Sequence, residues 1–339
     1  MGLTLGVVGA TGAVGRIMVR LLEERHFPAE RVRFFASPRS AGQKISFRGR
    51  DIEVEPLNPD SFRGIDLVVS STPDDVAGEM LPHAVKAGAV VVDESAYFRM
   101  HEDVPLVVPE VNPGAIERHK GIIASPNCST IQLVVALKPL HDVAKVRRVR
   151  VATYQAASGA GRRAAEELTA QTRALIEGRE VTAREFAHQL AFNLIPQIGS
   201  PREEGFTSEE VKMARETKKI FEDPTIEVCA TCVRVPVANA HSEVVFVETE
   251  RAVTVEEARK LFSAAPGIRV VDDVAAGQYP MPLQVSGTDE VYVGRIRRDP
   301  CSPNGLVFWC VADNLRKGAA TNAIQIAEIL AAKLAPRSV

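Results

Sequence analysis

The sequence predicts an α/β protein of two domains, an N-terminal Rossmann-type, doubly wound parallel sheet followed by an α+β domain with a mixed sheet. Three observations predict this fold class. The chain has 339 residues, too many for one ordinary hydrophobic core. Its first apolar run leads through a glycine-rich turn into a helical pattern, and after residue 127 short alternating elements give way to longer helices and period-two strands. We expect the first domain over 1–127, with a final helix over 314–339 packing back on it, and the second domain over 128–313.

The composition is that of a globular protein. Hydrophobic residues make up 45% of the chain and charged residues 25%, which provides a sizeable core. Lys and Arg (41) nearly balance Asp and Glu (43), so no excess of charge favours nucleic acid or an anionic membrane. No apolar run reaches the ~18 residues of a membrane helix, and the start lacks a signal-peptide pattern. We therefore expect a cytoplasmic protein that binds a small molecule and neither nucleic acid nor membrane.

The first element is a strand over residues 3–8, which leads through a glycine turn into a helix. The turn reads Gly9-Ala10-Thr11-Gly12-Ala13-Val14-Gly15. Glycines let the backbone approach a pyrophosphate, and a helix amino end offers free N–H groups and a favourable dipole. Glycine turns also close strand–helix joints for packing reasons. In this strand–turn–helix context, the spacing favours a dinucleotide-binding turn.

Further strands are expected over 32–36, 66–70 and 90–93, with a helix near 76–86, and this alternation predicts a parallel sheet. In NAD-selective sites an acidic residue follows the second strand. Here that segment reads Ser37-Pro38-Arg39-Ser40, which suits a 2′-phosphate and favours NADP, although a solvated turn arginine is the alternative. Thr72 follows the third strand, where such sheets bind ligands; it could instead cap the next helix.

The second half of the sequence predicts longer helices and strands of alternating polarity. Helices are expected over 162–178, 209–221 and 316–335, and strands with alternating polarity over 227–237 and 242–248. This pattern predicts a mixed or antiparallel sheet with helices on one face.

Cys128 follows a Pro-Asn turn and precedes an apolar run of helical character. At a helix start, unpaired N–H groups and the helix dipole favour the thiolate, which is the nucleophilic form of cysteine. A cysteine in front of an apolar helix is more often a small packing residue. Position alone therefore leaves both interpretations open.

The other four cysteines do not indicate a metal site. Cys229 and Cys232 have CxxC spacing, but they lie in an alternating β pattern, and Cys301 and Cys310 form no second pair of this kind. Five cysteines in a chain of this length also argue against a disulfide framework. We expect free thiols and no metal.

His241 lies seven residues after Arg234, at the entrance of an expected strand. Histidine is the usual proton carrier near neutral pH, and arginine binds a carboxylate through two parallel hydrogen bonds, so the pair would suit an anionic substrate. Each residue alone is more often a surface or hydrogen-bonded residue. The Tyr-x-x-x-Lys pair of short-chain dehydrogenases occurs at none of the four tyrosines, which argues against that class.

The order and spacing of several motifs are more specific than any one of them. The motifs are the glycine turn, Ser37-Pro38-Arg39-Ser40-Ala41-Gly42, Tyr97-Phe98-Arg99-Met100, Val108-Pro109-Glu110-Val111-Asn112, Pro126-Asn127-Cys128-Ser129-Thr130, Gln155 before Ser158-Gly159-Ala160-Gly161, and Asp313-Asn314-Leu315-Arg316-Lys317-Gly318. Together they resemble the aspartate-β-semialdehyde dehydrogenase family over nearly the whole chain.

The resemblance implies NADPH-dependent, reversible reductive dephosphorylation of β-aspartyl phosphate to aspartate semialdehyde, with inorganic phosphate as co-substrate in the reverse direction. This reaction stands at the branch point to lysine, threonine, methionine and diaminopimelate. Cys128 would be the nucleophile that forms an acyl thioester. His241 would protonate the collapsing thiohemiacetal oxygen in one direction and remove that proton in the other. Gln155 would position the substrate beside the thiol.

The resemblance also implies a set of substrate-binding residues. Arg234 would bind the α-carboxylate and Glu209 the amine. Because Glu209 lies three residues before Lys212, a surface ion pair on one helical face is the alternative for it. Arg99, Asn127 and Lys212 would form the phosphate pocket, since two cations and an amide suit a doubly charged leaving group.

The cofactor implied by the resemblance is NADP(H), without a metal. Its implied ligands are Gly9, Thr11, Gly12, Ala13 and Val14 at the pyrophosphate, Ser37, Arg39 and Ser40 at the 2′-phosphate, Thr72, and Ser158, Gly159 and Asn314 towards the nicotinamide. The second domain, 128–313, would carry catalysis and dimerisation and give a homodimer or a homotetramer.

Two other functions compete with this one. N-acetyl-γ-glutamyl-phosphate reductase also pairs a glycine turn with a thioester cysteine, but its substrate amine is blocked, so Glu209 would have no cation to bind. A catalytically silent NADP-binding homologue could dispense with Cys128 and His241, and both are present.

Overall fold

The computed structural model describes residues 2–334, which form two compact units, 2–126 with 319–334, and Asn127–Gly318. The sequence-based boundary at 127 lies one residue from the first of these limits. Residues 314–318, which were expected with the first unit, belong to the second by their contacts. Met1 and the predicted helical residues 335–339 lie outside the described residues.

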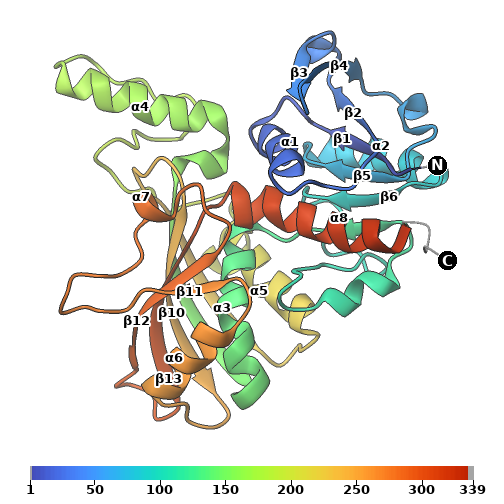
Figure 1. Ribbon diagram of the computed structural model, residues 1–339. Helices are drawn as coiled ribbons and strands as arrows, with labels where there is room; N and C mark the ends of the chain where they lie inside the picture. Colours follow the sequence, from blue (N-terminus) through green and yellow to red (C-terminus); the bar gives the residue numbers. More distant parts are fainter. Residues whose placement is uncertain (1, 335–339) are drawn as a thin grey trace. The chain divides into compact units, whose positions relative to one another are not determined.

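The first unit contains a seven-stranded sheet (Figure 1). In the order β3-β4-β2-β1-β5-β6-β7 its strands are Lys44–Phe47, Arg50–Pro56, Arg31–Ala36, Thr4–Val8, Leu67–Ser70, Val90–Asp93 and Ile122–Ala124. All neighbouring pairs are parallel except β3 with β4. The strand order reverses between β2 and β5 on either side of β1, as in doubly wound sheets. Sequence reasoning missed β3, β4 and β7.

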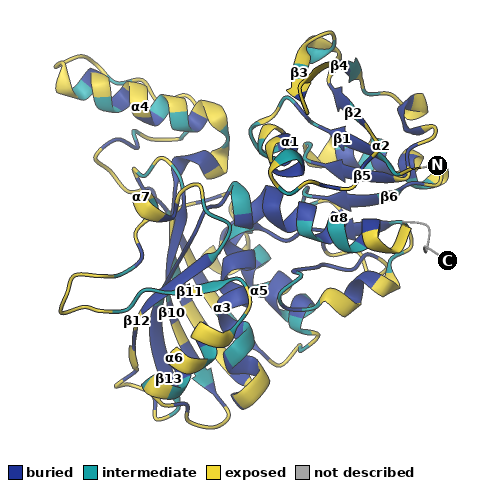
Figure 2. Cartoon of the chain, viewed as in Figure 1, coloured by how far each residue is buried: buried dark blue, intermediate teal, exposed yellow. Residues whose placement is uncertain are grey.

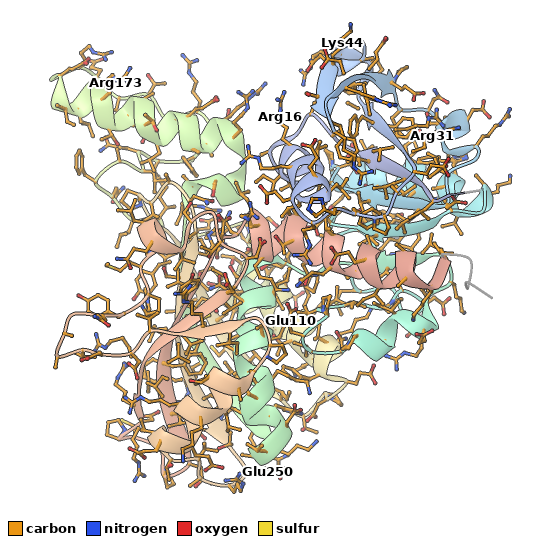
Figure 3. The ribbon with its side chains drawn as sticks, in the orientation of Figure 1. Arg16, Arg31, Lys44, Glu110, Arg173 and Glu250 are labelled. Carbon is orange, nitrogen blue, oxygen red and sulfur yellow. The ribbon has the colours of Figure 1, made fainter. Side chains whose placement is uncertain are left out.

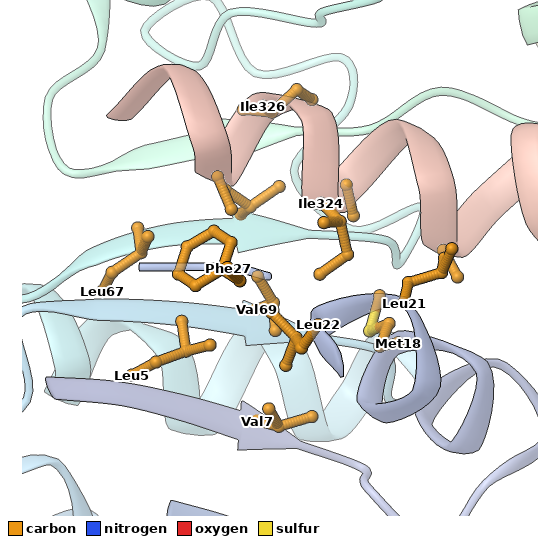
Figure 4. Close-up of a cluster of buried hydrophobic side chains, with 14 of the residues drawn as sticks. Leu5, Val7, Met18, Leu21, Leu22, Phe27, Leu67, Val69, Ile324 and Ile326 are labelled. Atoms are coloured by element: carbon orange, nitrogen blue, oxygen red, sulfur yellow. The ribbon is translucent and has the colours of Figure 1, made fainter. Parts of the chain in front are cut away.

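Two helices from opposite ends of the chain share one core on this sheet. α1, Ala13–Glu24, and α8, Thr321–Leu334, pack together against β1 and β5. Figure 4 shows Leu22 of α1 and Ile324 of α8 beside Val7 and Val69. The predicted final helix thus begins at Thr321, after a π-helical turn over Arg316–Ala320, rather than at residue 316. A third helix, α2, spans Asp74–Lys86.

The second unit contains a six-stranded mixed sheet. In the order β11-β12-β13-β10-β8-β9 its strands are Ile268–Val270, Val291–Arg298, Gly305–Ala312, His241–Thr249, Val146–Gln155 and Glu227–Arg234. β8 with β9 and β11 with β12 are parallel pairs, and the pairs between them are antiparallel. The predicted fold class, with a parallel sheet in the first half and a mixed sheet in the second, is confirmed.

Helices α3, Cys128–Ala144, α5, Ser208–Phe221, and α6, Val255–Ala264, pack on this sheet. α3 is apolar almost all round and buried, whereas α4, Arg162–Ile176, has a long exposed side (Figure 2). A short helix, α7, spans Pro282–Val285. None of the helices within residues 2–334 is long and apolar enough to cross a bilayer.

Candidate active site

Cys128 is the first residue of α3. The side-chain oxygen of Asn127 caps the helix by accepting the N–H groups of Ser129 at 3.0 Å and Thr130 at 3.3 Å. A Cβ added to Gly318 would lie 3.0 Å from the Cβ of Cys128, so glycine leaves room beside the thiol. Cys128 is partly exposed. The predicted placement at a helix start is therefore confirmed, and full burial as a packing residue is wrong.

The predicted catalytic residues of the sheet gather at the ends of three neighbouring strands. Gln155, the last residue of β8, pairs in register with Arg234, the last of β9. His241 opens β10, on the other side of β8, and its Nδ1 accepts the backbone N–H of Ala156 at 3.0 Å. The pairing of these strands therefore brings Gln155 and His241, 86 positions apart in the sequence, to the same end of the sheet.

His241 is fully buried. Because Nδ1 accepts a hydrogen bond, the neutral ring carries its proton on Nε2. Burial, and secondarily the charge of Arg234, lower the pKa of His241 well below its ordinary value. Nε2 has no hydrogen-bond partner among the described residues. The ring therefore presents an unengaged N–H, and the surface alternative for His241 is wrong.

Gly159 keeps a space open in front of the imidazole. A Cβ at this position would lie 2.9 Å from His241 Nε2 and 2.8 Å from Arg234 Nη1. Such contacts are too short for a real side chain, so only glycine fits without displacing His241 or Arg234. Gly159 therefore gives a ligand access to both groups.

Arg234 is buried, and Cys128 is among the groups that act on its charge. Its Nη1 donates to the carbonyl oxygen of Ala156 at 2.6 Å. Burial lowers the pKa of its guanidinium, while the neighbouring groups Cys128 and Glu209 oppose that shift. An arginine remains charged in any protein. Its cation is therefore available to a thiolate and to an anionic substrate.

Glu209 is at the centre of a second buried network. One carboxylate oxygen accepts from Asn127 Nδ2 at 2.8 Å and from Gln155 Nε2 at 3.1 Å. The other lies 3.7 Å from Lys212 Nζ. The i,i+3 ion pair is present, but the Glu209 side chain is only 9% exposed, so the surface alternative is wrong. Four predicted substrate residues are thus joined around one carboxylate.

Ser158 and Asn314 also lie together. Asn314 Nδ2 donates to Ser158 Oγ at 3.0 Å, and Asn314 Oδ1 accepts the N–H of Ala240, directly before His241, at 3.0 Å. The predicted cofactor residues of the second unit therefore adjoin the loop that leads into the histidine.

In the first unit, backbone geometry shapes the glycine turn. Gly9 has φ +79°, and a Cβ there would lie 2.1 Å from the carbonyl oxygen of Ser71. A Cβ on Gly15 would lie 2.1 Å from the carbonyl oxygen of Gly9. Gly12 is the N-cap of α1 and provides no side-chain cap, so the first-turn N–H groups at Ala13 and Val14 are left for a ligand.

Arg16 is a residue near this turn that sequence reasoning missed. Its Nε donates to the carbonyl oxygen of Thr11 at 3.1 Å, and it is exposed (Figure 3). It places a positive charge beside the turn. Its position four residues after Gly12, one helical turn away, is the signal that could have identified it.

The remaining predicted residues of the first unit are either exposed or make a hydrogen bond to a nearby group. Ser37 and Arg39 are exposed beside the 3₁₀ turn Pro38–Ser40, directly after β2. Thr72 Oγ1 lies 3.4 Å from Ser70 Oγ, and the N-cap of α2 is Pro73, so the helix-cap alternative for Thr72 is wrong. Arg99 is buried and donates to the carbonyl oxygen of Glu94 at 2.7 Å.

The cysteines other than Cys128 offer no shared site. Cys229 is exposed and Cys232 buried, because residues three apart point to opposite faces of β9. Burial raises the pKa of Cys232 beyond the usual range and that of Cys310 well above its ordinary value. Among residues 2–334 no group of three or more His, Cys, Asp or Glu side chains is arranged to hold a metal ion.

The geometry matches known proteins along the whole chain. Family models described as the NAD binding domain and the dimerisation domain of semialdehyde dehydrogenase match residues 4–119 and 137–317. The aspartate-semialdehyde dehydrogenase of Aquifex aeolicus is 52% identical over 334 residues, which cover 97% of this chain and 98% of that protein. The chain belongs to the aspartate-semialdehyde dehydrogenase family.

Solved structures of aspartate-semialdehyde dehydrogenases share the fold. Enzyme II from Vibrio cholerae, complexed with ASA, is 42% identical with a TM-score of 0.95, over 97% of this chain and 98% of that one. The Candida albicans enzyme with NADP is 30% identical with a TM-score of 0.77, over 98% and 99%. The family resemblance seen in the motifs is therefore confirmed.

Proposed function

We propose that this chain catalyses the reversible, NADPH-dependent reductive dephosphorylation of L-aspartyl 4-phosphate to L-aspartate 4-semialdehyde, in the biosynthesis of lysine, threonine, methionine and diaminopimelate. The observation that carries the proposal is the unengaged Nε2 of buried His241, which faces Gly159 beside Arg234. Arg234 in turn interacts with Cys128. Cys128, His241 and Arg234 would supply a nucleophile, a proton carrier and an anion-binding cation, all from one unit.

NADP fits the first unit. The positive φ of Gly9 and the uncapped start of α1 leave backbone N–H groups for a pyrophosphate. Ser37, Arg39 and Ser40 would hold the 2′-phosphate, because no carboxylate stands among residues 36–42 to bind a ribose hydroxyl instead. Bound there, the cofactor supplies the hydride that reduces the thioester to the aldehyde level.

The chain's own residues perform the acyl transfer. The Cys128 thiolate attacks the acyl carbon, a C–S bond forms, and the C–O bond to phosphate breaks with its electron pair leaving on phosphate. The guanidinium of Arg234 stabilises the thiolate before attack. In the reductive direction His241 Nε2–H would donate a hydrogen bond to the thiohemiacetal oxygen while that oxygen is negative, and the C–S bond would then break with its electron pair returning to the Cys128 sulfur. In the other direction the same N–H would stabilise the oxygen as the thiolate adds to the aldehyde.

Substrate specificity would rest on the two opposite charges that the α-carbon of the amino acid carries. Arg234 would bind the α-carboxylate, and Glu209 the α-ammonium, with Gln155 holding the acyl group beside the thiol. An N-acetylated substrate would offer Glu209 no ammonium group, so this buried carboxylate would keep Lys212, 3.7 Å away, as its cation and gain nothing from the substrate. We therefore favour free aspartyl over N-acetylglutamyl phosphate.

The phosphate would be bound by Asn127, Lys212 and Arg99. Lys212 lies one helical turn from Glu209 and is partly exposed, so its ammonium can reach a leaving group. Asn127 already donates from Nδ2 to Glu209, which ties the phosphate end to the amine end of the substrate.

We further propose that the enzyme is a homodimer through its second unit, in which a dimerisation-domain model matches residues 137–317. The side chains of β8 and β10 that point away from the packed helices include Tyr154, 39% exposed, and Phe246, 37% exposed. Large exposed apolar groups of this kind favour a protein interface. Sedimentation equilibrium of the purified chain distinguishes this dimer from a tetramer.

A cytoplasmic location also belongs to the proposal. All five cysteines are free, two of them exposed, which suits a reducing compartment.

The deciding experiment is phosphate-dependent reduction of NADP with L-aspartate semialdehyde. N-acetyl-glutamate semialdehyde and the Cys128→Ser variant are measured beside it. We expect turnover of the first substrate alone and its loss in the variant. Binding of NADP without turnover of either substrate would instead identify a silent homologue.

A further inference from the structure

Beneath the catalytic residues the sheet carries a second polar row. Residues two positions apart on a strand face the same side, so Thr153 lies behind Gln155, and Glu243 behind His241. Glu243 pairs in register with Thr153 of β8 and with Cys310 of β13. All three are fully buried. Polar groups therefore continue from the site into the core.

Helix α3, which packs on this face of the sheet, also places a polar residue one turn below its catalytic candidate. Gln132 follows Cys128 by four residues, one turn along α3, and is fully buried. α3 packs against β8, β10 and β13. The backbone oxygen of Gln132 lies 3.8 Å from Cys310 Sγ, which places this turn of the helix over the second row.

Glu243 and Gln132 bring an acid and an amide into this second row, one from the sheet and one from the helix. Both Glu243 oxygens and both polar side-chain atoms of Gln132 are buried without a well-formed hydrogen bond to a described residue. Burial raises the pKa of Glu243 well above its ordinary value, and the Gln132 amide opposes that shift. Burying a polar group without a hydrogen bond costs folding free energy. The presence of two such residues in the core therefore calls for a functional explanation.

We propose that Glu243 and Gln132 form a buried pair that positions His241 and Cys128 by fixing β10 against the first turns of α3. An apolar pair could fill the same volume, but it could slide along the strand, whereas an acid and an amide that approach each other to form a hydrogen bond would do so in one relative position. An uncharged acid also adds no negative charge beneath the thiolate. The inference rests on the proposed function, because this alignment matters only if the two residues act in one reaction.

The test compares single and paired substitutions. Glu243→Leu and Gln132→Leu should each lower kcat by roughly 10- to 100-fold, the scale of a small misplacement of reacting groups, with KM values nearly unchanged. Glu243→Gln keeps the uncharged shape and should retain kcat. Gln132→Glu, which places two acids together, should lose kcat, and the swap Glu243→Gln with Gln132→Glu should recover it.

Val245→Ala is the matched control, since Val245 is the next buried residue on the same face of β10. It should lower the melting temperature without lowering kcat. If Glu243→Leu loses no more turnover than this control at equal stability, the inference is overturned. If Glu243→Leu does not fold, the swap decides: recovery relative to Gln132→Glu supports the pair, and no recovery overturns it.

The pH dependence of stability gives a second readout. The groups around Glu243 include Gln132, Thr153, Cys310 and Cys232, and of these the two thiols titrate, each with a pKa that burial raises. Burial raises the pKa of folded Glu243 above that of the unfolded residue, so above about pH 4.3 the unfolded state loses this proton first and the contribution of Glu243 to stability falls as the pH rises. Glu243→Gln should therefore raise the melting temperature more at pH 8 than at pH 5. An equal change in melting temperature at pH 5 and pH 8 would contradict a pair in which Glu243 is uncharged.

Failure of the inference differs from failure of the proposed function. Wild-type chain without turnover of aspartate semialdehyde would remove the function. Wild-type turnover with an undisturbed Glu243→Leu would remove only the positioning role.

Discussion

The two units build their candidate functional groups from different atoms. In the first unit, the glycine turn acts through backbone N–H groups and through space that a Cβ would fill, and Arg39 and Arg16 are exposed. In the second unit, His241, Arg234 and Glu209 are buried side chains, each hydrogen-bonded to groups distant in sequence.

This difference corresponds to the two tasks. A cofactor that binds and leaves needs an open turn and a diffuse positive charge, whereas acyl transfer needs groups held by their neighbours. We therefore expect substitutions in the second unit to affect kcat, and substitutions in the first unit to affect cofactor affinity.

His241→Gln should have the largest effect on turnover. Losing the proton carrier should lower kcat by roughly 10²- to 10⁴-fold, measured as phosphate-dependent NADP reduction. His141→Gln is the matched control, because His141 is also buried and its Nδ1 also accepts a backbone N–H, that of Val146 at 3.3 Å. An equal loss in both variants would make His241 a structural residue.

Gly159→Ala should follow. Its new Cβ would displace His241 and Arg234, and a shift of this size should lower kcat by about 10²-fold. Gly114→Ala, where a Cβ meets nothing within 4 Å, should leave the rate unchanged. Normal turnover in Gly159→Ala would show that the His241 ring can move aside without lowering kcat.

Arg39→Ala tests the first unit. Loss of one charge-assisted bond to the 2′-phosphate should raise KM for NADP by roughly 10-fold or more and leave NAD use nearly unchanged. Arg31 is also exposed, at the opposite end of β2, and Arg31→Ala serves as control (Figure 3). A large fall in kcat with an unchanged KM for NADP in Arg39→Ala would contradict the assignment of cofactor binding to the first unit.

Thr207→Ala should have the smallest effect. Thr207 and Glu210 form the capping box of α5, the helix that carries Glu209 and Lys212, and its loss should cost about 1 kcal/mol of unfolding free energy. Thr254→Ala removes the corresponding N-cap of α6 at similar cost. Thermal denaturation should rank the two together, while KM for aspartate semialdehyde should rise only in Thr207→Ala.

Some strands could not be predicted from the sequence because their patterns are weak. β7 has three residues, and β3 with β4 form a polar hairpin-like pair whose residues are mostly exposed or half-buried. The start of α8 was misplaced because residues 316–320 have helix-forming composition but continue as a wider π turn. Glu243 and Gln132 were missed because a lone acid or amide in an apolar run has no distinguishing local pattern.

The sequence by itself determined the features that depend on neighbouring residues: the glycine turn, the helix start at Cys128, the missing carboxylate after β2 and, through ordered motifs, the family. Each is local because backbone conformation and helix caps involve residues a few positions apart. Only the tertiary structure decided that Glu209 is buried with Asn127 and Gln155, that Gly159 faces His241, and that the His241 proton lies on Nε2. Those outcomes depend on strand register and on burial, which bring together residues up to 85 positions apart. They also act through side chains whose partners no local pattern specifies.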